Sequence, residues 1–168
     1  GNVFTIQDFV YTVQGSNENK PLNNNENQRP SKVCFYNNRL VFVGTKELPT
    51  VAFFSDLNNI NSFTFNLSSD ENAIPSIDGF YCNLDYLTTK PQYLITNQNF
   101  LAVFSKSEVI IILANGDLTL TTIQTYKVDS MGIGNKKPLN FKNNILFFDS
   151  SNKNIKLLAF DFNTQSYT

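Results

Sequence analysis

The segment Asn37-Asn38-Arg39-Leu40-Val41-Phe42-Val43 sets a pattern that recurs twice further along the chain. In each copy a polar, Asn-rich turn precedes an apolar strand, and a short polar turn with a Lys leads into a second apolar strand. Short apolar runs that alternate with turns, without helical periodicity, predict an all-β chain. The other two copies are Asn-Gln-Asn-Phe-Leu-Ala-Val-Phe at 97–104 and Asn-Asn-Ile-Leu-Phe-Phe-Asp at 143–149.

The spacing of these copies indicates how the hairpins are organised. Leu40, Leu101 and Leu146 occupy the same place in the pattern and are 61 and 45 residues apart. These intervals are about the length of one four-stranded propeller blade. We therefore expect antiparallel hairpins that form part of a β-propeller, with about three blade units over residues 29–168. Unrelated hairpins in a β-sandwich are the alternative.

The boundaries of the strands follow from the apolar runs and the turn residues between them. Asn115-Gly116 predicts a tight hairpin, because both residues tolerate positive φ. Gly132, Gly134 and Pro138 mark a longer loop. At the N-terminus we expect a domain over residues 1–28 made of a strand at 3–13 and an Asn-rich loop or linker at 15–28. The other expected strands lie near 33–36, 39–43, 50–55, 62–67, 92–96, 100–105, 108–114, 118–127, 145–149 and 154–160.

Length and charge limit the possible classes of protein. The 168 residues fit one domain, or a piece of a larger one, and 13 Lys and Arg against 14 Asp and Glu give a net charge of −1. That balance offers no whole-chain attraction to nucleic acid or anionic lipid. The longest apolar run, Val109–Ala114, is too short to span a membrane. Because the chain begins at Gly1 rather than Met and ends after a strand-like stretch, we expect a segment of a longer polypeptide.

The residue types that most often carry chemistry are scarce. The chain has no His, which excludes His-based triads and the commonest ligand of transition metals. Cys34 and Cys82 are too few for a disulfide framework and are expected to be buried as small hydrophobic residues, with a single bridge as the alternative. The interpretation that follows is a protein that is not an enzyme, with no catalytic, cofactor-binding or metal-binding residue.

Four local patterns suggest a site, and each has a simpler structural interpretation that we prefer. Asp70-Glu71 is the only adjacent carboxylate pair, but neighbours on a strand point to opposite faces, so a glycosidase would need a distant partner. The oxygen-rich stretch 149–154 resembles a calcium loop but lacks its Gly and Glu, which favours a hairpin turn. Gly132–Lys137 lacks the strand and helix of a phosphate loop. The aromatic pairs Phe35-Tyr36, Phe53-Phe54 and Phe147-Phe148 are expected to pack between strands rather than stack on bases or sugars.

Read in order from Arg29, the chain resembles the tail proteins of short-tailed bacteriophages that form the nozzle, or tail-stabilisation, β-propeller beneath the portal. The similarity covers about 140 of the 168 residues. Ile110 stands where the family often has Trp, and Gly132 is not followed by Ser. The matching motifs are Arg29-Pro30-Ser31-Lys32-Val33, Phe35–Gly44, Thr50–Asp56, Asp70-Glu71-Asn72-Ala73-Ile74, Leu101–Ser105, Glu108–Ile111, Tyr126, Met131-Gly132, Pro138 and Asn144–Phe148.

The resemblance implies structural work in the virion tail. Members of this family form a ring, usually sixfold, that extends the portal channel, retains DNA in the head and conducts it during ejection. The implied partners are identical subunits in that ring, the portal or an adaptor, and tail fibres or a needle, with non-specific contact to DNA in the channel. A channel wall of Asp, Asn and Ser would let DNA slide, since Lys and Arg would retard it.

Two other functions remain open from the sequence. A receptor- or glycan-binding β-domain of a tail would present exposed Tyr and Asn around a pocket. A hydrolase built on a propeller would need two carboxylates whose pKa values are shifted by a shared site.

Overall fold

The computed structural model describes residues 29–63, 77–114 and 116–161, together with short strands at 10–12, 19–21 and 166–167. The prediction of an all-β chain is confirmed, because the described residues contain no helix and most of their strands belong to three antiparallel sheets. The expected pair Asp70-Glu71 and most of the expected strand at 62–67 lie outside the described residues, and Ser62 and Phe63 are not in a strand.

Each of the three sheets is an up-and-down meander of strands that follow one another in the chain. The first sheet contains β3 (Lys32–Tyr36), β4 (Arg39–Val43), β5 (Val51–Phe54) and β6 (Phe80–Asn83). The second contains β7 (Tyr93–Thr96), β8 (Leu101–Phe104), β9 (Val109–Ala114) and β10 (Ile123–Asp129). The third contains β11 (Leu139–Phe141), β12 (Asn144–Phe148) and β13 (Ile155–Leu158). Two further pairs are β1 (Val10–Thr12) with β2 (Asn19–Pro21), and β14 (Phe160–Asp161) with β15 (Ser166–Tyr167).

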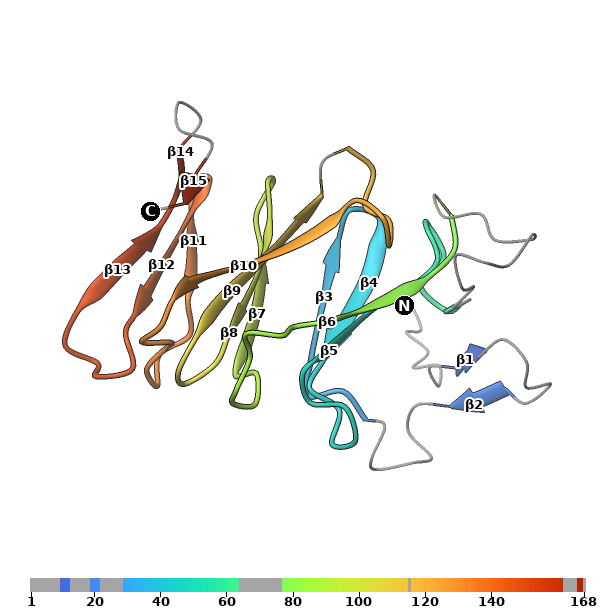
Figure 1. Ribbon diagram of the computed structural model, residues 1–168, viewed down its shortest axis with the longest axis horizontal. Coiled ribbons are helices and arrows are strands. Elements are labelled where there is room, and N and C mark those ends of the chain that lie inside the picture. The colour runs from blue at the N-terminus through green and yellow to red at the C-terminus, as the bar shows by residue number, and fades with distance from the viewer. Residues whose placement is uncertain are drawn as a thin grey trace, which may run out of the picture.

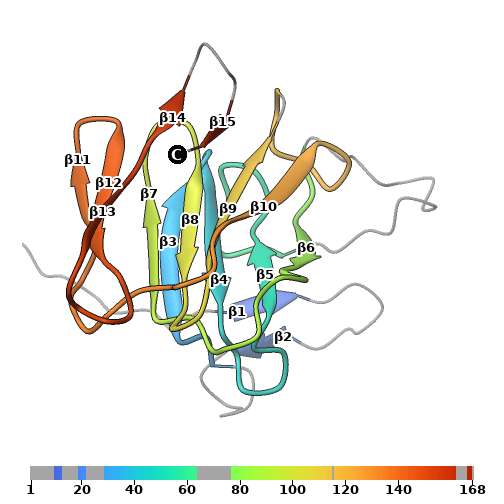
Figure 2. The same ribbon diagram turned by 60° about the vertical axis from the view of Figure 1, so that its left-hand side comes forward.

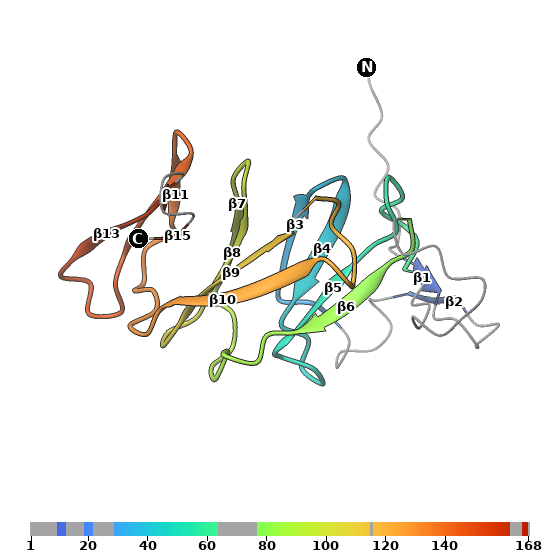
Figure 3. The same cartoon turned by 45° about the horizontal axis from the view of Figure 1, so that its top comes forward.

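The three sheets stand in sequence order along the long axis of the molecule, with the second sheet between the other two (Figure 1). The same order is visible when the molecule is tilted (Figure 3). When the molecule is rotated about the vertical axis, the strands of the first and second sheets overlap in the view (Figure 2). The first strands of neighbouring sheets, β3 and β7, lie side by side.

The two larger hydrophobic clusters lie one on each face of the second sheet, and a small third cluster around Phe42 and Phe63 lies on the outer face of the first sheet. Alternate residues of a strand point to opposite faces, so the continuous apolar run of β8 serves both of the larger clusters. Leu101 and Val103 pack with residues of the first sheet, whereas Ala102 and Phe104 pack with residues of the third. β9 divides in the same way, with Ile110 and Ile112 toward the first sheet. The central strands β8 and β9 of the second sheet are therefore buried on both faces.

The repeated hairpins form the second and third strands of each sheet, but the third copy is shifted by one residue. Leu40 and Leu101 lie at matching positions, each facing away from the next sheet in the chain. In the third sheet Ile145 faces the second sheet, so Leu146 points to the outer side. The two-residue turns show the origin of this shift. The turn Asn37-Asn38 is followed by Arg39, so Leu40 is the second residue of β4. The turn Lys142-Asn143 is followed by Asn144, so Leu146 is the third residue of β12. A shift of one residue exchanges the two faces of a strand.

The loop after β9 differs from its prediction. The expected tight hairpin at Asn115-Gly116 is wrong, because Ala114 pairs with Ile123 and the connection spans residues 115–122. Leu118 from this connection is buried in the core between the first and second sheets. A backbone bond from Ile123 N to Thr119 O then turns the chain into β10, five residues later than expected. Burial of Leu118 thus outweighs the turn preference of the Asn-Gly pair.

One tight turn and one close approach show where the chain requires special backbone conformations. Asn37 and Asn38 have φ of 50° and 58°, the geometry of a two-residue hairpin turn with both central residues left-handed. Gly132, with φ of 61°, lies against the backbone of Lys106, where a Cβ would be 2.3 Å from the carbonyl carbon. The expected loop around Gly132 and Gly134 is the connection from β10 to β11, and Ile133 within it is buried between the second and third sheets.

Candidate functional site

Arg39 is a fully buried charge at the end of the first sheet. Its Nη1 donates hydrogen bonds to the backbone oxygens of Ser55 at 2.7 Å, Asp78 at 2.9 Å and Ile77 at 3.2 Å. The guanidinium also lies over the ring of Phe80, 5.3 Å from its centroid. Burial lowers the pKa of Arg39, and the negative charges of Asp56 and Asp78 oppose this effect. Arg39 therefore joins β4 to the chain that enters β6, and this is structural work.

Glu108 is the second buried charge, and it closes the turn between β8 and β9. Its carboxylate accepts hydrogen bonds from the hydroxyls of Thr88 and of Ser105, the latter at 2.6 Å. Ser105 Oγ in turn accepts a bond from the backbone N–H of Glu108 at 2.9 Å. Burial acts to raise the pKa of Glu108, but these hydrogen bonds and the charge of Lys127 lower it below its ordinary value. The group is therefore held as a carboxylate.

Asp149 organises the turn between β12 and β13. It accepts hydrogen bonds from the hydroxyl of Ser151 at 2.5 Å, from the backbone N–H of Ser151 at 3.1 Å and from Asn154 Nδ2 at 2.6 Å. The bonds from Ser151 and Asn154 lower the pKa of Asp149 to about 2. The stretch considered for calcium is thus a hairpin turn whose carboxylate is occupied by its own residues. In the part of the chain that the structure describes, no three His, Cys, Asp or Glu side chains gather as a metal site.

The phosphate-loop-like stretch and the two cysteines also lie in ordinary structural elements and form no site. Gly132–Lys137 leads into the strand β11 and not into a helix. Cys34 and Cys82 are free, and they lie on β3 and β6 at opposite edges of the first sheet. Strands three places apart are separated by about 14 Å, too far for a disulfide. Burial raises the pKa of each thiol to about 12. No helix among the described residues is long and apolar enough to cross a membrane.

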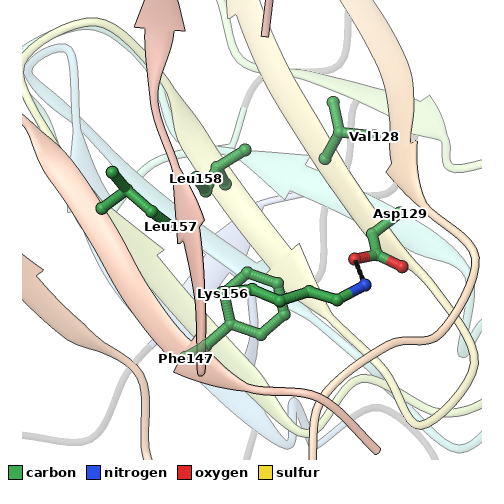
Figure 4. A pocket seen from close by; sticks show the side chains of 6 residues that line it. All are labelled: Val128, Asp129, Phe147, Lys156, Leu157 and Leu158. Atoms are coloured by element: carbon green, nitrogen blue, oxygen red, sulfur yellow. Dashed lines mark hydrogen bonds and ion pairs between the residues drawn. The ribbon is translucent and has the colours of Figure 1, made fainter. Parts of the chain in front are cut away.

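A shallow cleft of about 290 Å³ lies between the second and third sheets, where β10 faces β13 (Figure 4). An ion pair between Lys156 and Asp129 joins the two sheets across it, and Phe147 forms its floor. The third sheet has one strand fewer than the other two, and the cleft lies beside β13, its edge strand. The cleft has no exposed Tyr in its lining, which a glycan site would use for stacking. It therefore belongs to the junction of the sheets.

The outer faces of the first and third sheets are the features that the internal packing leaves unexplained. Each aromatic pair of the sequence is divided between the two faces of its strand, so Tyr36, Phe54 and Phe147 are buried in the junctions. Their neighbours Phe35, Phe53 and Phe148 lie on the opposite, outer faces of the same sheets. Sequence analysis identified the aromatic residues as packing residues but could not distinguish inner from outer faces.

The outer face of the third sheet is apolar across all three of its strands. The register places its side chains in two rows, because Leu139, Leu146 and Leu157 are cross-strand neighbours and Phe148 pairs with Ile155. Leu139 is 63% exposed, Phe141 54%, Ile155 67% and Leu157 47%. Within these strands the only charged side chain, Lys156, pairs with Phe147 and points to the second sheet. Apart from Asn144, which pairs with Phe141, the outer face of the third sheet therefore consists of apolar side chains that are half-buried or exposed.

The outer face of the first sheet carries a row of aromatic rings. Phe42 and Phe53 stack with ring centroids 4.9 Å apart, and Phe53 is 6.2 Å from the ring of Tyr81, so the row crosses β4, β5 and β6. Phe63, from the connection between β5 and β6, covers Phe42. Beyond this cover, Val33 and Phe35 of β3 are more than half exposed. These two outer faces are the candidate functional surfaces.

Neither a protein-family model nor a curated protein matches the chain. The family resemblance therefore rests on the sequence motifs alone.

Proposed function

We propose that this chain is a structural segment of a short-tailed bacteriophage tail, part of the nozzle ring that extends the portal channel, retains DNA and conducts it during ejection. In this proposal the three sheets are blades of a β-propeller, and the protein acts by assembly rather than catalysis. The single observation that carries the proposal is the row of three antiparallel meanders in which the middle sheet packs against a neighbouring sheet on each face.

The packing supports blades more than a sandwich. A two-sheet sandwich has one core between two sheets, each with a polar outer face. Here three meanders stand in a row, the middle one is covered on both faces, and the first strands β3 and β7 are adjacent. Radial repetition of four-stranded meanders is the arrangement of propellers, which hold about 4 to 8 blades.

The positions of the motifs agree with this proposal. Arg39 of the motif Phe35–Gly44 joins the strands of the first sheet, and Gly44 has a positive φ of 75°. Asp56 ends the next motif and accepts a hydrogen bond from the backbone N–H of Gly79 at 2.6 Å. The motif residues thus stabilise the sheets, which is what a structural protein requires. The exposed Tyr81, Tyr86 and Tyr126 do not surround the cleft that the structure contains.

The test is to mix the purified chain with the portal ring of the same virus and to examine the mixture by negative-stain electron microscopy. We expect added density below the portal, coaxial with its channel, and the chain in the tail of purified virions by mass spectrometry. A chain that does not bind the portal, but binds surface glycans of the host on an array, would instead support the receptor-binding alternative.

A further inference from the structure

The net charge of −1 conceals an uneven distribution of charge along the strands of the three sheets. In each sheet the turn between the second and third strands carries an exposed Lys, and these residues are Lys46, Lys106 and Lys153. Because the three sheets share one meander order, the three turns lie at the same end of the stack, the lower end in Figure 1.

The two connections from one sheet to the next pass through the same end. Residues 84–92 lead from β6 to β7 and carry Lys90, and residues 130–138 lead from β10 to β11 and carry Lys136 and Lys137. We call the surface formed by these turns and connections the lysine end. Its six exposed Lys are Lys46, Lys90, Lys106, Lys136, Lys137 and Lys153.

Contacts between the first and second sheets show that the lysine end is continuous there. Pro91, next to Lys90, lies against the first turn, where a Cβ on Gly44 would be 3.6 Å from Pro91 Cδ. Thr88 of the same connection donates a hydrogen bond to the carboxylate of Glu108, in the turn of the second sheet. Residues 84–92 therefore join the turn that carries Lys46 to the turn that carries Lys106.

Contacts between the second and third sheets extend the surface in the same way. The backbone N–H of Ile133 donates to the carbonyl oxygen of Ser105 at 2.8 Å. The backbone N–H of Asn135 donates to Asn152 Oδ1, in the turn of the third sheet, at 2.9 Å. The lysine end therefore crosses all three sheets.

Few negative charges oppose these lysines. The exposed carboxylates in the same turns and connections are Glu47 and Asp85, against six exposed Lys. Glu108 and Asp149 also belong to these turns, but both are buried and accept hydrogen bonds from their own turns. Among the described residues, none of the six Lys forms an ion pair.

The opposite end of the stack has the reverse balance. Its turns and connections carry one exposed Lys, Lys142, in the turn between β11 and β12. They also carry Asp56, Asp78 and Asp117. The positive charge is therefore concentrated at one end of the described chain.

The side chains between the lysines indicate the class of partner. Phosphate oxygens of nucleic acids are contacted chiefly by Lys and Arg and by small Ser, Thr and Asn side chains. Stable protein interfaces are instead depleted in Lys and Ser. The exposed apolar residues Leu48, Tyr86 and Met131 come from three separate connections. The exposed small polar residues of the lysine end include Ser130, Asn135, Ser150, Ser151 and Asn152.

From this segregation of charge we propose that the lysine end binds the phosphate backbone of a nucleic acid. Neighbouring sheets pack about 10 Å apart, so three sheets span about 20 Å, the length of about six base pairs. The lysine end has no Arg, the side chain that most often reads guanine, so its binding does not depend on base sequence. This inference assigns residues to a nucleic-acid contact and does not require the nozzle proposal or a ring.

The experiment is fluorescence anisotropy of a labelled DNA duplex of about 20 base pairs, titrated with the purified chain at about 50 mM NaCl. We expect a dissociation constant in the micromolar range, equal for two unrelated sequences. Each Lys that neutralises a phosphate contributes about −0.9 to the slope of the logarithm of the binding constant against the logarithm of the salt concentration. The expected slope is therefore about −4 to −5.

A double variant and a matched control locate the contact. Lys106→Gln combined with Lys153→Gln should weaken binding at least tenfold at about 50 mM NaCl and make the slope less negative by about two, because two phosphate contacts are lost. Lys142→Gln removes the same charge at the opposite end and should leave both quantities unchanged. Circular dichroism verifies that each variant is folded. A double variant that binds like the wild type would overturn the inference.

Comparison probes separate a nucleic acid from other acidic partners. Polyglutamate and vesicles rich in phosphatidylserine should bind more weakly than the duplex. If either bound as tightly, the lysine end would belong to an acidic protein or to a membrane surface, and the proposal would be wrong. Absence of duplex binding at about 100 μM chain would also overturn it.

The results also separate this inference from the proposed function. A chain that binds the duplex through the lysine end but ignores the portal would support this inference and contradict the nozzle proposal. A chain that binds the portal but not the duplex would do the reverse.

Discussion

The packing between the second and third sheets allows the stability cost of removing the Phe104 side chain to be predicted. This side chain is fully buried, and its ring meets that of Phe147 edge to face, with centroids 5.1 Å apart and an interplanar angle of 63°. Removing a buried Phe ring costs about 3 to 5 kcal/mol, through lost burial and the cavity left behind. We expect Phe104→Ala to lower the free energy of unfolding by that amount, measured by urea titration with an unchanged m value.

A double-mutant cycle tests whether this loss comes from the junction itself. Phe104→Ala and Phe147→Ala should couple by about 0.5 to 1.5 kcal/mol, the range for edge-to-face aromatic pairs. Tyr86→Ala is the control, because this aromatic side chain is half exposed, and its removal should cost within about 0.5 kcal/mol. If the Ala variants do not fold, Phe104→Leu and Phe147→Leu allow a milder cycle. A cost below about 1 kcal/mol for Phe104→Ala, with no coupling, would refute the packing of these two sheets.

Three further predictions concern the buried polar groups and the thiols. Arg39→Met should lower the free energy of unfolding by about 3 kcal/mol, since it removes one hydrogen-bond donor from each of three backbone oxygens; a neutral result in urea titration would contradict the role given to Arg39. The folded pKa of Asp149 is depressed, so its contribution is present above the ordinary value of 3.8 and lost as the pH falls toward about 2. The midpoint temperature of thermal unfolding should therefore fall less steeply with decreasing pH in Asp149→Asn than in the wild type. Identical slopes of midpoint temperature against pH would count against the hydrogen bonds of this turn. Cys34 and Cys82 are partly exposed, yet they should react with a thiol reagent at pH 8 much more slowly in the folded chain than after unfolding, because burial raises both pKa values to about 12; equal labelling rates in the two states would contradict this reasoning.

The sequence predicted the strands that are rich in apolar residues and missed those that depend on a partner. β4, β8 and β9 appear almost at their expected bounds, because a continuous apolar run is only stable when buried on both sides. β6 and β11 were not expected. β11 is short and exposed, and it exists because it pairs with β12, while β6 is positioned by β5 and by the stacking of Phe54 on Phe80.

The candidate surfaces were beyond the reach of the sequence for a related reason. Apolar alternation does not reveal which face of a strand is covered. The spacing of the Leu residues suggested that Leu146 matches Leu40 and Leu101, but Ile145 is the residue of β12 that packs against the second sheet. Only the pairing register showed that Leu146, Leu157 and Leu139 form one open surface. The sequence brought up Asp149 only within a calcium-like stretch and Glu108 only within the strand motif Glu108–Ile111, and the role of both in turns depends on hydrogen bonds that no spacing encodes.

Cryo-electron microscopy of the chain assembled on the portal ring would test the central claim most directly. The account predicts propeller density coaxial with the channel, in which β3, β7 and β11 are the inner strands and other sheets cover the outer faces of the first and third sheets. A map in which the chain stands alone, with Ile155 and Phe35 facing solvent, would contradict it.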